Sequence, residues 1–381
     1  MSGSCLSLNP NHWPRRPFVL RLRWRGLRWL FVALLISAVV ACAPARVPPG
    51  PGDTEPRLES DRFVASDGLG LPLRRWLPDR EAWPRPRAVV LALHGFNDYS
   101  NAFEDTGAYM AERGLAVYAY DQRGFGAGPH AGLWGGREAM VADLRTASRL
   151  LARRHKGVPL FVLGESMGGA VAVLAFTSAA PPPAAGVILS APAVWARGTM
   201  PWYQRATLWL SARLIPWARF SGRGLGVQAS DNIEMLRGLG RDPLVIKETR
   251  VDAIDGLTDL MSEALAAAGD FKAPSLVLYG EKDEIVPRAP TLRFWRDLPE
   301  AARDWQRRAL YAEGWHMLLR DLQADRVRAD ILAWVENFDA PLPSGADLHA
   351  EKALAEAAGD IVIGGAEDAE AAGAGAGPKA L

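Results

Sequence analysis

Short apolar segments recur along the middle of the chain, and longer segments with a helical pattern separate them. An apolar run bounded by turn residues is typical of a strand that is buried on both faces of a parallel sheet. Alternation of such strands with helices predicts the α/β class, a mostly parallel sheet with helices on both faces. The expected strands are residues 88–93, 115–120, 160–163 and 187–190, and the expected helices are residues 103–113, 137–155 and 168–179.

Further strands are expected before and after this region. Residues 62–66 and 71–76 flank Asp67-Gly68, a dipeptide that favours a tight hairpin turn. Residues 275–279 and 307–311 repeat the buried-strand pattern later in the chain. Ligands of such sheets bind beyond the C-terminal ends of the strands. The residues that directly follow each strand are therefore the candidates for function.

The two ends of the chain differ in composition from this body. Residues 1–41 contain six arginines and no acid, and they end in an apolar run that is shorter than the ~20 residues of a transmembrane helix. This pattern predicts an export signal peptide. Residues 42–57 are rich in Pro and Gly and are expected to form an extended tether. Residues 339–381 consist largely of Ala, Gly and acids, so we expect disorder beyond a short helix near 347–358 and a folded body over 58–338.

The junction Val39-Val40-Ala41-Cys42 resembles the lipobox of bacterial lipoproteins. The resemblance implies that Cys42 is acylated and becomes the first residue of the mature protein, and the alternative is an ordinary cleavage site. Each buried CH₂ contributes about 0.8 kcal/mol, so several acyl chains would hold the protein on a membrane. Residue 43 is alanine and not aspartate, which by the sorting rule of Gram-negative lipoproteins would favour the outer membrane. We therefore expect a lipid-anchored protein of the cell envelope.

Charge and cysteine content exclude other classes of protein. The net charge is +1, and removal of the six leader arginines leaves −5 for residues 42–381, so nucleic-acid binding is not expected. The two cysteines, Cys5 and Cys42, cannot form a disulfide in a processed chain. No His and Cys residues cluster with the spacing of a metal site, and we expect no metal or other cofactor.

The motif with the clearest chemistry is Gly164-Glu165-Ser166-Met167-Gly168-Gly169, which follows an expected strand and opens an expected helix. A serine on such a sharp turn sits in strained backbone, and only small neighbours avoid a clash. The turn lifts the hydroxyl above the sheet, and the N-terminus of the helix favours developing negative charge. Ser166 is therefore the candidate nucleophile.

A serine nucleophile needs a base, and the chain contains six histidines. His94 and His316 both follow strands, but His94 precedes the serine, whereas α/β hydrolases have the order serine, acid, histidine. His316 fits that order and is the candidate base. The other four lie in the leader, the expected tail, a glycine-rich loop and a cationic helix end: His12, His349, His130 and His155.

The acid is expected after a strand that lies between the serine and the histidine. Residues 280–287 follow the expected strand 275–279 and contain three carboxylates. We favour Asp283 as the acid that orients the base, and Glu281 and Glu284 remain alternatives.

Five motifs occur in a characteristic order: His94-Gly95-Phe96, Tyr120-Asp121-Gln122-Arg123-Gly124-Phe125-Gly126, the Ser166 motif, Gly280-Glu281-Lys282-Asp283-Glu284-Ile285-Val286-Pro287 and Gly314-Trp315-His316. Over roughly residues 62–337 they resemble the monoacylglycerol lipase and lysophospholipase family of α/β hydrolases. The resemblance implies Ser166 as nucleophile, Asp283 as acid and His316 as base, with an oxyanion hole formed by the backbone N–H groups of Phe96 and Met167. The family usually has histidine at the position of Glu165, and this departure bears on substrate preference.

The family also carries a helical cap before the strand that bears the acid, which here corresponds to residues 196–270 within a core of 58–195 and 271–338. Four tryptophans recur at near-heptad spacing at its start. This spacing favours a packed helical face. The alternative is that some rings line an acyl pocket or enter a membrane interface. The residues are Trp195, Trp202, Trp209 and Trp217.

The expected activity is hydrolysis of a carboxylic ester through an acyl-enzyme on Ser166. A lipid-derived ester such as a monoacylglycerol or a lysophospholipid is the expected substrate. One alternative is a short-chain carboxylesterase or thioesterase with soluble substrates, and another is a non-catalytic envelope lipoprotein that uses the fold for binding. Epoxide hydrolases and dehalogenases need a carboxylate at position 166 and are excluded.

Overall fold

The computed structural model describes residues 29, 43–52, 54–222, 224 and 226–356. The chain divides into two units, residues 1–43 and 44–381, and the fold below is that of the second unit. Apart from Trp29, the expected signal peptide lies outside the described residues, and so does Cys42. In the part of the chain that is described, no helix is long and apolar enough to cross a bilayer.

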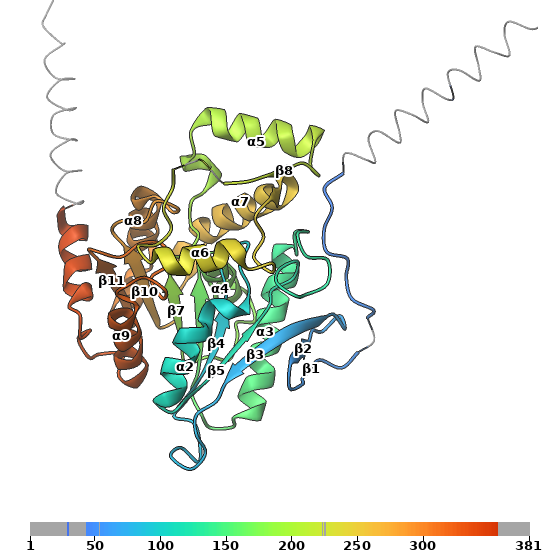
Figure 1. Ribbon diagram of the computed structural model, residues 1–381. Coiled ribbons are helices and arrows are strands. Elements are labelled where there is room, and N and C mark those ends of the chain that lie inside the picture. The colour runs from blue at the N-terminus through green and yellow to red at the C-terminus, as the bar shows by residue number, and fades with distance from the viewer. Residues whose placement is uncertain (1–28, 30–42, 53, 223, 225, 357–381) are drawn as a thin grey trace, which may run out of the picture. The chain divides into compact units, whose positions relative to one another are not determined.

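A nine-stranded sheet forms the centre of this unit (Figure 1), with the strand order β1-β2-β3-β5-β4-β6-β7-β10-β11. The strands from β5 to β11 pair in parallel, and β1, β2 and β3 add antiparallel strands at one edge. The expected α/β class with a mostly parallel sheet is confirmed. The strands are β1 (Arg57–Leu58), β2 (Arg62–Val64), β3 (Gly70–Trp76), β4 (Ala88–Leu93), β5 (Leu115–Tyr120), β6 (Leu160–Glu165), β7 (Gly186–Ser190), β10 (Ser275–Gly280) and β11 (Gln306–Tyr311).

Helices cover both faces of the sheet because successive residues of each central strand point to opposite sides. In β4, Val89 and Leu91 belong to one buried cluster, and Val90 and Ala92 belong to the other. The first cluster also contains side chains of α3, α4, α7 and α8, whereas the second contains side chains of α2 and α9. These helices are α2 (Glu104–Glu112), α3 (Arg137–Arg154), α4 (Met167–Thr177), α7 (Val251–Ala266), α8 (Arg288–Asp297) and α9 (Ala324–Glu336), and short 3₁₀ segments are η1 (Ser100–Phe103) and η4 (Glu300–Trp305).

The segment before β1 differs from the expected free tether. Val47 is buried, and its N–H donates to the carbonyl of Trp134 at 2.9 Å. The N–H of Gly50 donates to Asp67 at 3.0 Å, and the N–H of Ala45 donates to Asp252 at 3.0 Å. Local composition did not reveal these contacts because every partner lies outside the segment, 17 or more positions away. Residues 44–52 thus form a strap that is bound to the folded body.

The end of the chain contains the short helix expected near residues 347–358, but this helix belongs to the folded body. Residues 346–356 form a helix, and the structure describes nothing beyond it. Three of its four alanines, Ala346, Ala350 and Ala353, are buried against the body together with Leu342. Small side chains spaced three or four residues apart let a helix approach closely although they bury little area each. The folded body therefore extends at least to residue 356, and not to 338.

Residues 196–270 are mainly helical, as expected for a cap. Of the helices in this segment, α7 packs on α4 of the core, and α5 lies farthest from the sheet in Figure 1. The expected packed face of tryptophans is wrong for three of the four rings, because Trp202, Trp209 and Trp217 are 78%, 53% and 47% exposed. Trp195 alone packs against the core. The elements are η2 (Arg197–Thr199), α5 (Trp202–Leu214), β8 (Arg219–Phe220), α6 (Ile233–Arg241), β9 (Thr249–Arg250), α7 and η3 (Ala268–Asp270), and the β8–β9 pair was not expected.

Candidate active site

Ser166 occupies the turn between β6 and α4, with φ of 51° and ψ of −112°. Such a backbone conformation costs roughly 1–3 kcal/mol in a residue other than glycine. The neighbouring glycines permit it, because a Cβ at Gly164 would lie 2.6 Å from the carbonyl oxygen of Gly168, and a Cβ at Gly168 would lie 2.2 Å from that of Leu93. The turn is fixed by the N–H of Ser166, which donates to the carbonyl of Ser190 at 2.9 Å. The sequence motif thus forms the sharp strand-to-helix turn that it predicts.

His316 and Asp283 meet beyond the ends of β11 and β10. Nδ1 of His316 donates to Oδ2 of Asp283 at 2.8 Å, and both side chains are buried. The other carboxylate oxygen, Oδ1, accepts from the N–H groups of Ile285 at 2.8 Å and Val286 at 2.9 Å. Burial lowers the pKa of His316, but the adjacent Asp283 carboxylate outweighs burial, so this pKa lies above its ordinary value.

The two alternative acids have other partners. Glu281 faces Arg288 at 3.6 Å, and Glu284 accepts from the N–H of Gln228 at 2.7 Å. Both are exposed, whereas Asp283 is 8% exposed. The structure therefore brings Asp283, and neither of these glutamates, to the imidazole.

His94, the other histidine that follows a strand, is held entirely by backbone. Its Nδ1 donates to the carbonyl of Gly95 at 2.8 Å, and its Nε2 accepts from the N–H of Gln122 at 2.9 Å. Burial lowers its pKa, which keeps the ring neutral. The side chain of Gln122 also donates to the carbonyl of His94 at 2.8 Å. These hydrogen bonds hold the loop that carries Phe96 in place. Sequence order alone did not reveal this structural role of His94.

In the described part of the chain, the backbone N–H groups of Phe96 and Met167 have no hydrogen-bond acceptor, and both residues lie near Ser166. Met167 is the first residue of α4, so its N–H cannot be used within the helix. Free N–H groups beside a serine hydroxyl can donate to a negatively charged oxygen. The geometry thus provides two donors and the positive end of a helix dipole beside one hydroxyl.

A cavity of about 560 Å³ opens over these groups, and Ser166 and His316 both line it. Its walls are largely apolar and come from the core and from residues 196–270. This composition suits a long acyl chain with its reacting carbonyl at the serine. Wall residues include Trp195, Met200, Leu208, Leu257, Met261 and Val286.

The floor of this cavity carries three charged side chains. Arg320 donates to Glu165 at 3.2 Å and pairs with Asp98 at 2.7 Å. All three are less than 10% exposed. Burial lowers the pKa of Arg320, but Glu165 and Asp98 outweigh burial and raise it. The sequence motif drew attention to Glu165, and nothing in the sequence pointed to its partner.

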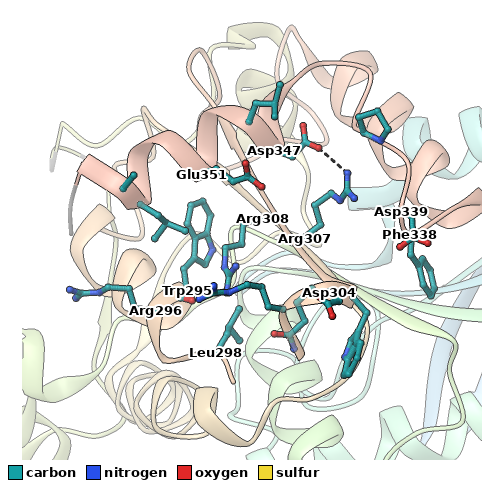
Figure 2. Close-up of a pocket in the computed structure, with 17 residues that line it drawn as sticks. Trp295, Arg296, Leu298, Asp304, Arg307, Arg308, Phe338, Asp339, Asp347 and Glu351 are labelled. Atoms are coloured by element: carbon teal, nitrogen blue, oxygen red, sulfur yellow. Dashed lines mark hydrogen bonds and ion pairs between the residues drawn. The ribbon is translucent and has the colours of Figure 1, made fainter. Parts of the chain in front are cut away.

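A second cavity of about 790 Å³ lies beside the first residues of β11 (Figure 2). Arg307 pairs there with Asp347 at 2.9 Å, and Arg308 donates to the carbonyl of Trp295 at 3.1 Å. Among the described residues that line it there is no serine, cysteine or histidine. It therefore lacks the serine and histidine that the first cavity brings together. Over the described part of the chain, no group of three or more His, Cys, Asp or Glu residues is arranged to hold a metal ion.

Comparison with known proteins gives relatives that this chain covers over most of their length. A monoacylglycerol lipase of Mycolicibacterium smegmatis is 27% identical over 294 residues, which cover 72% of this chain and 95% of that protein. Monoglyceride lipase of Rattus norvegicus is 24% identical over 78% of this chain and 95% of its own length.

Solved structures share the fold. A soluble variant of the monoglyceride lipase of Saccharomyces cerevisiae, in complex with a substrate analog, superposes with a TM-score of 0.62 at 23% identity, covering 78% of this chain and 100% of that one. A carboxyl esterase of Bacillus coagulans superposes with a TM-score of 0.60 at 18% identity, covering 73% of this chain and 98% of that one. At such identities the likeness concerns the fold alone. The model of the serine aminopeptidase S33 family matches residues 84–323, and the chain therefore belongs to this family of α/β hydrolases.

Proposed function

We propose that the chain is a serine hydrolase of carboxylic esters in which Ser166, His316 and Asp283 form the catalytic triad. The observation that carries the proposal is the convergence of a strained, glycine-flanked serine and an aspartate-bound histidine on one cavity. Membership of a hydrolase family and the monoacylglycerol lipases among its relatives support it.

In the proposed mechanism, Nε2 of His316 accepts the hydroxyl proton as Oγ of Ser166 attacks the ester carbonyl. Asp283 holds Nδ1 protonated and stabilises the imidazolium that forms. The N–H groups of Phe96 and Met167 donate to the oxyanion of the tetrahedral intermediate. His316 then gives its proton to the leaving alcohol, and an acyl-enzyme remains. Water, deprotonated by the same imidazole, attacks the acyl group and releases the carboxylic acid.

We infer a lipid-derived ester, such as a monoacylglycerol or a lysophospholipid, as the substrate. The apolar walls of the cavity support this choice, because an acyl chain gains about 0.8 kcal/mol for each CH₂ removed from water. The exposed aromatic and aliphatic side chains of α5 support it as well, since they would face the membrane in which such substrates reside. They are Trp202, Tyr203, Trp209, Leu210 and Leu214.

Anchoring through an acylated Cys42 is part of this proposal, with the outer membrane as the address in a Gram-negative source. The lipobox-like sequence supports it. Metabolic labelling with an alkyne fatty acid tests it directly. Wild-type protein should take up the label and remain with membranes, whereas Cys42→Ala should remain unlabelled. Equal labelling of both would assign the acylation elsewhere.

A substrate panel tests the proposed activity. Monoolein, lysophosphatidylcholine and p-nitrophenyl esters of increasing chain length are compared for the wild type and for Ser166→Ala. We expect hydrolysis that favours long acyl chains and a fall in kcat of roughly 10³–10⁶-fold in the variant. Activity confined to short soluble esters would agree with the triad but would contradict the proposal of a lipid-derived substrate. Equal rates for the two proteins would reject Ser166 as the nucleophile.

A further inference from the structure

Arg320 binds two carboxylates that come from different parts of the fold. Glu165 is the last residue of β6 and directly precedes the nucleophile, and Asp98 lies in the loop after β4 that also carries Phe96. Arg320 itself lies four residues after His316 in the loop after β11. Nη1 of Arg320 lies 2.7 Å from Asp98, and Nη2 lies 3.2 Å and 3.3 Å from the two oxygens of Glu165. One guanidinium thus joins the three loops that carry the reacting groups.

The three charges do not cancel. Two carboxylates and one guanidinium leave one net negative charge in a buried place, where charges interact far more strongly than in water. Removal of the arginine would leave two negative charges in this network. Removal of Glu165 would leave the network with no net charge. The network therefore sets the local charge that His316 experiences.

Several charged groups surround His316 in addition to this network. Asp283 and Glu165 favour its protonated form, and Arg320 opposes protonation. Asp321, on the same loop as His316, accepts from Ser230 and from the N–H of Trp315 at 2.8 Å, and burial raises its pKa to about 6. Of these groups, the carboxylates of Asp283 and Glu165 draw a proton to the imidazole, and the Arg320 cation counters them.

We propose that Arg320 is a positioning residue: it holds Glu165 and Asp98 in place and offsets their charge, so that His316 remains available as a base at neutral pH. This inference rests on the proposed function, because it takes His316 as the base. It goes further, since it assigns a role to a residue outside the triad and the oxyanion hole. The role follows from the paired distances, the burial and the number of charges of each sign.

The test is a set of pH profiles with a neutral ester, p-nitrophenyl butyrate, between about pH 5 and 10. Activity of a histidine base is lost as the pH falls through its pKa, so the acidic limb of kcat/KM reports His316. Arg320→Gln should move this limb upward by about one pH unit, and Glu165→Gln should move it downward. The double variant should return it to within about 0.3 units of wild type, because it restores one net negative charge.

Two further variants separate charge from packing. Arg320→Lys keeps the positive charge and should retain most of the wild-type limb, although it loses the fork that binds two carboxylates. Arg307→Gln removes a comparable arginine–aspartate pair at the second cavity and should leave the limb unchanged. If Arg320→Gln does not fold, the lysine and double variants carry the test.

An equal loss of kcat at every pH, with the limb unmoved in Arg320→Gln, would reduce Arg320 to a structural residue and overturn the inference. A shift that persists in the double variant would do the same. Failure of the proposed function is distinguishable, because wild type would then hydrolyse no ester or Ser166→Ala would retain full activity. In that case the ¹⁵N chemical shifts of His316, followed against pH in the same variants, still decide whether Arg320 sets its protonation.

Discussion

Nδ1 of His316 donates to Oδ2 of Asp283 at 2.8 Å, although 33 positions separate the two residues in the sequence. They meet because β10 and β11 are parallel neighbours in register, with Gly280 opposite Tyr311, so that their following loops leave the sheet at one edge. The bond assigns the proton to Nδ1 and leaves Nε2 as the acceptor.

Asp283→Asn should lower kcat by about 10⁴-fold with little change in KM, because an amide no longer enforces this tautomer or stabilises the imidazolium. The acidic limb of the remaining activity should move to lower pH, since the charge that most raises the pKa of His316 is lost. Steady-state kinetics across pH measures both effects. Glu284→Gln, a substitution in the same loop, should stay near wild type, and comparable losses in the two variants would contradict the assignment of Asp283.

Gly168→Ala should inactivate the protein, because its Cβ would lie 2.2 Å from the carbonyl oxygen of Leu93 and must displace the turn at Ser166. A displacement of about 1 Å there is enough to cost ~10²-fold in rate. The matched control is Gly238→Ala in α6, where a Cβ meets nothing within 4 Å and should stabilise the helix by up to about 1 kcal/mol. Thermal unfolding and ester hydrolysis are measured for both. Full activity in Gly168→Ala would show that the turn tolerates a side chain.

Replacement of Trp202 and Trp209 by serine should weaken binding to phospholipid vesicles and slow monoolein hydrolysis, because both rings are exposed on α5 and would contact the bilayer. Hydrolysis of p-nitrophenyl butyrate should not change. Leu348→Ser provides the control, since this residue is 66% exposed but lies on the helix of residues 346–356. Vesicle co-sedimentation, carried out on a form without the leader, reports the binding. Unchanged binding would exclude α5 as the membrane contact.

The strap of residues 44–52 should contribute to stability. A form that begins at residue 44 keeps the buried Val47 and its bond to Trp134, whereas a form that begins at residue 58 loses both. Burial of one valine and a few hydrogen bonds, offset by the ordering of the strap, is worth roughly 2 kcal/mol. Urea unfolding of the two forms measures the difference. Equal free energies of unfolding would mean that the strap contacts add nothing.

Sequence reasoning located the sheet well because its strands are apolar on both faces and bounded by turn residues. The expected range 88–93 coincides with β4, and 115–120 coincides with β5. The Asp67-Gly68 turn was also correct, with Gly68 at φ of 83° between β2 and β3. In these segments local pattern and tertiary burial agree.

Other features depend on contacts that are distant in sequence and were missed. A short helix near residues 347–358 was expected, but its packing against the body was not, because it buries mainly small alanine side chains that carry almost no hydropathic signal. The partners of Arg320 lie 155 and 222 positions earlier, so its role has no local signature. The three exposed tryptophans follow a spacing that is usual for a packed helical face. Spacing shows which residues share a face, but it does not show whether that face is buried or exposed. In each case the missing information is the tertiary partner.

The most direct measurement of the central claim is the site of covalent reaction with a fluorophosphonate probe, mapped by mass spectrometry of the intact protein and its peptides. The account predicts a single adduct on Ser166, abolished in Ser166→Ala and strongly slowed in His316→Ala. An adduct on another residue, or no adduct on a folded protein that hydrolyses esters, would contradict it.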